Sequence, residues 1–239
     1  MTDADATRPT PETPPEASGG AESARPVPIS TPRPMRLAVF ASGGGSNLGA
    51  ILDAVDAGTL GAVVAVVVTD REGIGALDRA AARGIPAETL APEAEPGAAA
   101  AQMLDVLARH EVHALALAGF LRKIPPPVVQ AYRHRILNVH PSLLPAFGGR
   151  GMYGARVHRA VLDYGAQFSG ATVHLVDDAY DTGPVVLQDT VPVYEDDTPE
   201  ALAARVLDVE HRLLPTALAL LADGRLSVRG RLVTIGGRP

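Results

Sequence analysis

Residues 36–69, RLAVFASGGGSNLGAILDAVDAGTLGAVVAVVVT, contain two apolar runs, a run of glycines and a helical pattern. Arg36–Ala41 (RLAVFA) predicts a buried strand, and Asn47–Ala57 predicts the helix that follows it. Ala62–Thr69 (AVVAVVVT) is nearly all apolar, which is typical of a parallel strand covered on both faces. A strand, a helix and a second apolar strand in this order predict one unit of a parallel sheet.

The same alternation continues to about residue 140. Further helices are predicted over Ile74–Arg83 and Gly97–His110, further strands over Ala87–Leu90, Ala114–Ala118 and Arg135–His140, and a break at Pro125–Pro127 just before or at a helix start. This order predicts an α/β fold with a doubly wound, mostly parallel sheet between two layers of helices.

After residue 165 the pattern changes. Gly170–Val176 and Val185–Val193 predict two longer strands joined only by a loop, and Pro199–Ala222 predicts one long helix. Arg225–Val228 and Arg231–Ile235 flank Arg229-Gly230 and predict a small hairpin. The sequence shows no internal repeat.

Residues 1–34 differ in composition from the rest. They are rich in Pro, Thr, Ala, Glu and Ser, and Val27 and Ile29 are their only bulky aliphatic residues. Such a segment buries too little apolar surface to offset the entropy of ordering it. We therefore expect a disordered N-terminal extension over 1–34 and one folded domain over 35–239, with Met35 as an alternative start of translation.

Composition excludes several classes of function. The 239-residue chain has a net charge of −6, 4% aromatic residues and no Trp, which argues against nucleic acid as a partner. It has no Cys, so disulfides, thiolate metal sites and cysteine nucleophiles are excluded. No apolar run reaches the ~18 residues that span a bilayer, and no secretory signal is present. We expect a cytoplasmic protein with small-molecule substrates and no membrane partner.

The glycine loop Ser42-Gly43-Gly44-Gly45-Ser46-Asn47 directly follows the first strand. Consecutive glycines let the backbone turn tightly and approach a ligand, and Ser46 or Asn47 can cap the next helix. The helix dipole favours an anion there, which indicates a phosphate site. A tight turn without a ligand is the alternative, because neither a full dinucleotide-binding pattern nor a Walker lysine is present.

Two further motifs carry polar side chains. Asn138 and His140 stand two residues apart in a strand, so they project from one face at its carboxyl end. Both side chains can donate hydrogen bonds to the oxyanion that forms during acyl transfer. The alternative for a lone histidine at this position is a structural role. The second motif is Val176–Pro184, an acidic loop between two apolar strands. A solvated turn is its alternative; calcium is disfavoured because no Glu follows at EF-hand spacing.

These motifs together resemble the phosphoribosylglycinamide formyltransferase family over residues 36–225. The resemblance rests on four segments in order, namely Ser42–Leu48, Ala118–Arg122, Asn138–Pro145 and Tyr180–Pro184. It implies a Rossmann-like three-layer α/β/α fold and transfer of the formyl group of 10-formyltetrahydrofolate to the amine of glycinamide ribonucleotide through a tetrahedral intermediate. It implies that the reaction requires no metal and that the protein is a monomer or a homodimer.

The resemblance also implies site residues. The catalytic residues are Asn138, His140 and Asp181; the ribonucleotide-binding residues are Gly45, Ser46, Asn47 and Glu210; the folate-binding residues are Leu121, Arg122, Lys123, Ile124 and Asn138. Asn138 and His140 would stabilise the oxyanion, and Asp181 would favour the charged form of His140. His174 supports this arrangement or is merely structural.

The sequence departs from the family at three places. Gly44 replaces the Asn of many relatives, Glu93–Ala100 contains no Arg to contact folate, and Arg150–Gly154 lengthens a loop as a candidate flap. The competing functions are formyltetrahydrofolate hydrolysis, methionyl-tRNA formylation and a non-catalytic nucleotide-binding module. Enzymes that hydrolyse formyltetrahydrofolate usually carry an N-terminal regulatory domain, and enzymes that formylate methionyl-tRNA add a basic C-terminal barrel. A non-catalytic nucleotide-binding module would not need Asn138, His140 and Asp181 together.

Overall fold

The computed structural model describes residues 26–92 and 97–237. A seven-stranded sheet with the order β4-β3-β2-β5-β6-β7-β8 forms its centre. The strands are β2 (Met35–Ala41), β3 (Ala62–Thr69), β4 (Ala87–Thr89), β5 (Ala114–Leu117), β6 (Ile136–His140), β7 (Phe168–Leu175) and β8 (Val185–Pro192). The helices are α1 (Ser46–Asp56), α2 (Gly75–Ala81), α3 (Ala98–Arg109), α4 (Pro126–Ala131), α5 (Ala155–Tyr164) and α6 (Pro199–Ala222).

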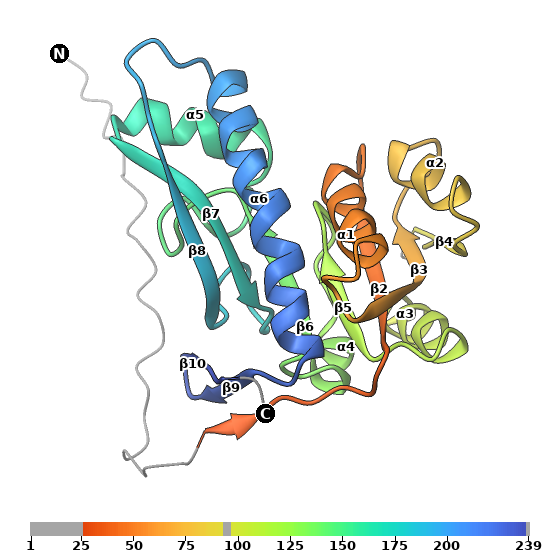
Figure 1. Ribbon diagram of the computed structural model, residues 1–239. Helices are drawn as coiled ribbons and strands as arrows, with labels where there is room; N and C mark the ends of the chain where they lie inside the picture. Colours follow the sequence, from red (N-terminus) through yellow and green to blue (C-terminus); the bar gives the residue numbers. More distant parts are fainter. Residues whose placement is uncertain (1–25, 93–96, 238–239) are drawn as a thin grey trace, which may run out of the picture.

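The sheet lies between two helical layers, as Figure 1 shows. On one face, Leu37 and Val39 of β2 join the apolar core that α1 and α6 also line. On the other face, Ala38 and Phe40 pack with the buried residues of α3 and α4. Strands β2 to β6 run parallel, whereas β7 is antiparallel to both of its neighbours. The predicted mostly parallel, three-layer α/β/α fold is therefore confirmed.

The strand order changes direction between β2 and β5. β2 pairs with β3 on one side and with β5 on the other, so the loops after β2 and β5 diverge at the carboxyl edge of the sheet. Ser42 joins these two loops: its N–H donates to Gly119 O at 3.2 Å, and its Oγ accepts from Leu121 N at 3.0 Å. Open α/β sheets bind ligands at such a point.

The connection after β6 covers the neighbouring part of the sheet. Thr172 of β7 donates through Oγ1 to Ser142 O at 2.6 Å and accepts from Leu144 N at 3.0 Å. Gln188 of β8 donates to Leu144 O at 2.9 Å. The segment that begins at Pro141 is thus tied back across β7 and β8, next to the polar side chains at the end of β6.

Helix α5 was not predicted from the sequence. Its residues ARVHRAVLDY include several charged side chains, and only Val157, His158 and Val161 are buried. The narrow apolar stripe follows a glycine-rich segment without a side-chain cap, so local signals for a helix start are weak. Packing of α5 against the core with α6 stabilises it.

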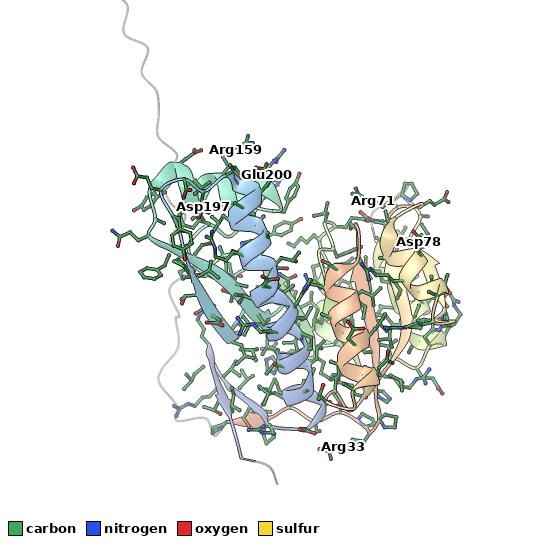
Figure 2. All side chains as sticks on the ribbon, turned by 45° about the horizontal axis from the view of Figure 1, so that its top comes forward. Arg33, Arg71, Asp78, Arg159, Asp197 and Glu200 are labelled. Atoms are coloured by element: carbon green, nitrogen blue, oxygen red, sulfur yellow. The ribbon has the colours of Figure 1, made fainter. Side chains whose placement is uncertain are left out.

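The N-terminal segment joins a small second sheet. β1 (Val27–Pro28) pairs with β9 (Leu226–Arg229), which also pairs with β10 (Leu232–Ile235) in the predicted hairpin. Ile29 is 5% exposed and donates its N–H to Leu226 O at 2.8 Å. Figure 2 shows Arg33 near the end of α6, where its guanidinium donates to Asp223 O at 3.0 Å. The predicted extension thus does not run to residue 34; residues 1–25 lie outside the described residues.

These contacts allow a test of Met35 as the functional start. A chain that begins at Met35 loses β1 and the burial of Ile29, which contributes ~2 kcal/mol. We expect its Tm to fall by about 4–8 °C relative to the full chain. A chain that begins at Pro26 keeps every one of these contacts and is the control. Equal Tm values for the two truncated chains in thermal denaturation would contradict the prediction.

Candidate active site

The glycine loop places Gly45 at the start of α1 in a conformation that requires glycine. Gly45 has φ +70°, and a Cβ there would lie 2.7 Å from Ala76 Cα. Gly45 itself is the N-cap, and no side chain caps α1, so the predicted capping by Ser46 or Asn47 is wrong. Both residues instead lie in the first turn of α1, where uncapped N–H groups are free to bind an anion.

Asn47 and Glu210 meet behind this loop. Asn47 Nδ2 donates to Glu210 Oε2 at 2.7 Å, and both side chains are buried. Asn47 Oδ1 has no hydrogen-bond partner among the described residues. Burial raises the pKa of Glu210 to about 7, although the hydrogen bond from Asn47 opposes the shift. The structure thus brings together two of the predicted ribonucleotide-binding residues from opposite ends of the domain.

The raised pKa of Glu210 makes stability depend on pH. In the unfolded chain Glu210 loses its proton near its usual pKa of 4.5, whereas in the folded protein it holds the proton to about pH 7. Its contribution to stability is therefore complete below pH 4.5 and is lost as pH rises through 7. Glu210→Gln keeps a hydrogen-bond acceptor for Asn47 without the buried charge.

We expect Glu210→Gln to be more stable than the wild type at pH 8. The gain should approach ~3 kcal/mol, the energy equivalent of raising a pKa from 4.5 to about 7. At pH 4.5 the two proteins should unfold at the same urea concentration. A gain of the same size at both pH values would show that the effect does not come from the ionisation of Glu210.

The three predicted catalytic residues lie together at the end of β6. His140 Nδ1 is 3.5 Å from Asp181 Oδ2, and Asn138 stands beside His140 on the same face of the strand. Asp181 comes from the loop between β7 and β8 and has φ +55°, a conformation that Asp adopts more readily than most residues. An amide, an imidazole and a carboxylate therefore share one partly buried cluster.

Backbone groups of the segment after β6 hold this cluster. His140 Nε2 is 2.9 Å from Phe147 O, and Gly149 N donates to Asp181 Oδ2 at 2.9 Å. A Cβ on Gly148 would lie 3.3 Å from the Asp181 Cβ, so the chain passes this closely because residue 148 is glycine. Because a carbonyl only accepts, His140 carries a proton on Nε2 and leaves Nδ1 facing Asp181.

Burial decides the protonation of His140, which the sequence left open. Burial lowers the pKa of His140 and outweighs the opposing effects of Asp181 and of Phe147 O. Burial raises the pKa of Asp181, but nearby His174, His140 and the Gly149 N–H lower it more. At neutral pH Asp181 is ionised and His140 is neutral, because burial outweighs the charged form that Asp181 favours. The Nδ1 of His140 carries no proton and can therefore accept one.

His174 orients the amide of Asn138. His174 Nδ1 is 2.9 Å from Leu175 O, so it carries the proton, and Nε2 accepts from Asn138 Nδ2 at 3.0 Å. His174 Nε2 also lies 3.7 Å from Asp181 Oδ1. Of the two interpretations that the sequence left open, the contacts favour support of the cluster.

His158 is a neighbour that sequence analysis missed. It lies on α5, is 4% exposed, and its Nδ1 has no hydrogen-bond partner in the described part of the chain. Burial lowers the pKa of His158, and the proximity of His140 lowers it further. Since α5 itself was not predicted, no local signal placed His158 here.

The predicted folate-binding segment follows β5 and divides into two parts. Leu121 is 42% exposed, and Lys123 Nζ lies 5.7 Å from the centre of the Tyr180 ring, which connects this segment to the Asp181 loop. Arg122 donates to Ala91 O at 3.1 Å. Ile124, in contrast, is 4% exposed and packs in the core with α3 and α4. Its side chain contributes to the core.

Residues 26–92 and 97–237 contain no group of three or more His, Asp and Glu side chains placed to hold a metal ion. Within the same residues, no helix is long and apolar enough to cross a membrane.

Comparison with known proteins agrees with this geometry. The formyl transferase family matches residues 35–218. The chain is 44% identical over 202 residues to the chloroplastic phosphoribosylglycinamide formyltransferase of Arabidopsis thaliana and 46% identical over 199 residues to that of Vigna unguiculata. These matches cover 83% and 82% of this chain, but 69% and 64% of the plant proteins. The Escherichia coli phosphoribosylglycinamide formyltransferase is 35% identical over 85% of this chain and 95% of its own length.

Solved structures give the same result. Glycinamide ribonucleotide transformylase 1 from Symbiobacterium toebii has a TM-score of 0.81 at 41% identity, over 85% of this chain and 94% of that chain. A formyltetrahydrofolate deformylase from Pseudomonas syringae has a TM-score of 0.77 at 24% identity, over 85% of this chain and 66% of that one. At that identity the second likeness extends to the fold alone.

Proposed function

The chain belongs to the phosphoribosylglycinamide formyltransferase family, and we propose that it transfers the formyl group of 10-formyltetrahydrofolate to the amine of 5′-phosphoribosylglycinamide. The observation that carries this proposal is the cluster of Asn138, His140 and Asp181 at the carboxyl end of β6, on the same edge of the sheet as a glycine loop that leaves α1 uncapped. The cluster supplies groups for acyl transfer, and the loop supplies N–H groups for the phosphate of the acceptor.

The acceptor amine attacks the formyl carbon, and the carbonyl π electrons move to oxygen to give a tetrahedral intermediate. One N–H of Asn138 is held by His174, so its second N–H is free to donate to the developing oxyanion. Neutral His140 accepts the proton of the amine at Nδ1, where ionised Asp181 stabilises the resulting positive charge.

The intermediate then collapses. The electron pair on the oxyanion re-forms the C=O bond, the bond between the formyl carbon and N10 breaks with its electron pair on N10, and His140 gives its proton to that nitrogen. Asp181 stays ionised throughout, because its lowered pKa keeps it from taking the proton. His140 thus acts as base and then as acid within one turnover.

The phosphate end of the acceptor is assigned to groups outside the Asn138, His140 and Asp181 cluster, which its amine enters. We assign its phosphate to the N–H groups of Gly45, Ser46 and Asn47, and its polar groups to Glu210 beside Asn47. Folate is assigned to the surface of Leu121, Arg122 and Lys123, with Ile124 supporting this segment from the core. Asn138 is assigned to both the chemical step and the folate.

The test follows loss of 10-formyltetrahydrofolate with and without glycinamide ribonucleotide. We expect deformylation that depends on the ribonucleotide and yields one formylated ribonucleotide for each folate released. Turnover at the same rate with water alone would favour hydrolysis, the alternative left open by the sequence. The matched control is free glycinamide, which lacks the ribosyl phosphate and should react only at high concentration.

Four expectations remain predictions. The chain is expected in the cytoplasm, although the plant relatives are named chloroplastic. It is expected to be a monomer or a homodimer, and its substrates are expected to be small molecules and not nucleic acid. The domain is expected to extend beyond the matched residues 35–218 to the C-terminal hairpin, which pairs with β1.

A further inference from the structure

Arg79 of α2 connects that helix to the glycine loop. Its Nε donates to Gly44 O at 3.1 Å, and Ala76 N donates to Gly43 O at 3.2 Å. A Cβ on Gly75 would lie 2.9 Å from Gly44 O, so the start of α2 packs directly against the loop. Two donors of α2 thus bind carbonyl groups of the glycine loop. The N–H groups of the loop are therefore turned away from α2.

The guanidinium of Arg79 reaches the loop by crossing α1 at Gly49. A Cβ at position 49 would lie 3.0 Å from Arg79 Nη1, which is tighter than ordinary contact. Glycine inside a helix is less stable than alanine, so its presence here carries a cost. The guanidinium of Arg79 occupies the space that a side chain at position 49 would fill.

A recess lies beside this contact. α1 stands between α2 and α6 in both views, and Figure 2 labels Asp78, the neighbour of Arg79. The recess has a volume of about 430 Å³ and is lined by Ser46, Gly49, Ala50, Asp53, Arg79 and His211. His211 Nε2 is buried without a hydrogen-bond partner among the described residues. Ser46, in the first turn of α1, connects the recess to the proposed phosphate site.

Arg79 differs from its neighbour Arg83. Arg83 forms ion pairs with Asp53 and Asp56 at 3.2 and 3.1 Å, so its charge is used to join α1 and α2. Within the residues that the structure describes, Arg79 forms no ion pair with a carboxylate, and its hydrogen bond goes to a loop carbonyl. Its positive charge therefore remains available next to a site proposed for a dianion.

We propose that Arg79 is a positioning residue for the phosphate of the ribonucleotide. It holds Gly44 O so that the loop presents the first N–H groups of α1 to the phosphate, and its guanidinium stabilises the bound negative charge. The proposal rests on the proposed function for the identity of the ligand. It assigns to Arg79 and Gly49 roles in acceptor affinity and none in the chemical step.

Three variants separate this role from a structural one. Arg79→Met removes the donor and the charge. Gly49→Ala leaves Arg79 in the chain but places a methyl group 3.0 Å from its Nη1, so the guanidinium must shift, while the better helix propensity of alanine offsets the loss of stability. Arg83→Met is the matched control, since it removes a cation from the same side of α1 without touching the glycine loop.

Steady-state kinetics with each substrate varied in turn gives the main readout. We expect Arg79→Met and Gly49→Ala to raise KM for the ribonucleotide about tenfold, as for loss of one charge-assisted hydrogen bond. kcat and KM for 10-formyltetrahydrofolate should stay within about twofold, and Arg83→Met should resemble the wild type. For Gly49→Ala, an unchanged Tm together with weaker acceptor binding excludes general destabilisation as the cause.

Binding of inorganic phosphate, measured by calorimetry, supports or overturns the proposal without turnover. A Kd for phosphate that rises about tenfold in Arg79→Met but not in Arg83→Met supports it, even if the wild type shows no transfer to the ribonucleotide and the proposed function fails. An unchanged phosphate Kd and an unchanged KM for the ribonucleotide in Arg79→Met would overturn it. So would equal weakening in Arg79→Met and Arg83→Met.

Discussion

Asp181→Asn should lower kcat by about 10²- to 10⁴-fold while the protein remains folded. The carboxylate lies 3.5 Å from His140 Nδ1, where it stabilises the positive charge that His140 acquires with the proton of the amine. Asparagine has the same shape and can still accept the hydrogen bond from Gly149 N, but it has no charge. The loss therefore isolates the electrostatic part of the role of Asp181.

Single-turnover rates with both substrates saturating measure this effect. Asp178→Asn removes a carboxylate from the same loop, outside the cluster, and is the control. KM for the ribonucleotide should change little in either variant, because its phosphate is assigned to the glycine loop and its polar groups to Glu210, neither of which belongs to this cluster. A rate for Asp181→Asn within about threefold of the wild type would refute the assigned role.

His140→Gln should also lower kcat by about 10²- to 10⁴-fold, since glutamine can donate to Phe147 O but has no basic nitrogen. The pH profile distinguishes this role from a structural one. The pKa of His140 is lowered by burial, so neutral His140 persists at pH 6.5 and is lost only as pH falls further. With both substrates saturating, the wild-type kcat should therefore decline only at pH values below the ordinary histidine pKa of 6.5.

The decline in rate at low pH should disappear in His140→Gln, because its residual rate does not depend on protonation of His140. His134→Asn is the control: burial also lowers the pKa of His134, but it lies before β6 and outside the cluster. Its φ of +62° is one that asparagine tolerates. If the decline were lost in His134→Asn and kept in His140→Gln, the proton acceptor would have been assigned to the wrong histidine.

Sequence patterns predicted most of the framework because those patterns are local. Ala62–Thr69 and Pro199–Ala222 were predicted with the bounds that the structure shows, since a continuous apolar run and a helical periodicity are set by neighbouring residues. Asn138 and His140 were placed on one face for the same reason. Helix α5 and strand β1 were missed because packing against distant segments stabilises them.

The sequence by itself determined the order of strands and helices other than β1 and α5, the pairing of Asn138 with His140, and the family to which the motifs point. Only the tertiary structure determined the protonation of the site, because burial depends on what the rest of the chain packs against. It made His140 neutral, raised the pKa of Glu210 beside Asn47, and set Phe147 O and Gly149 N as the holders of the cluster. It also placed Arg79 across Gly49 on the glycine loop, a contact between helices that no local pattern encodes.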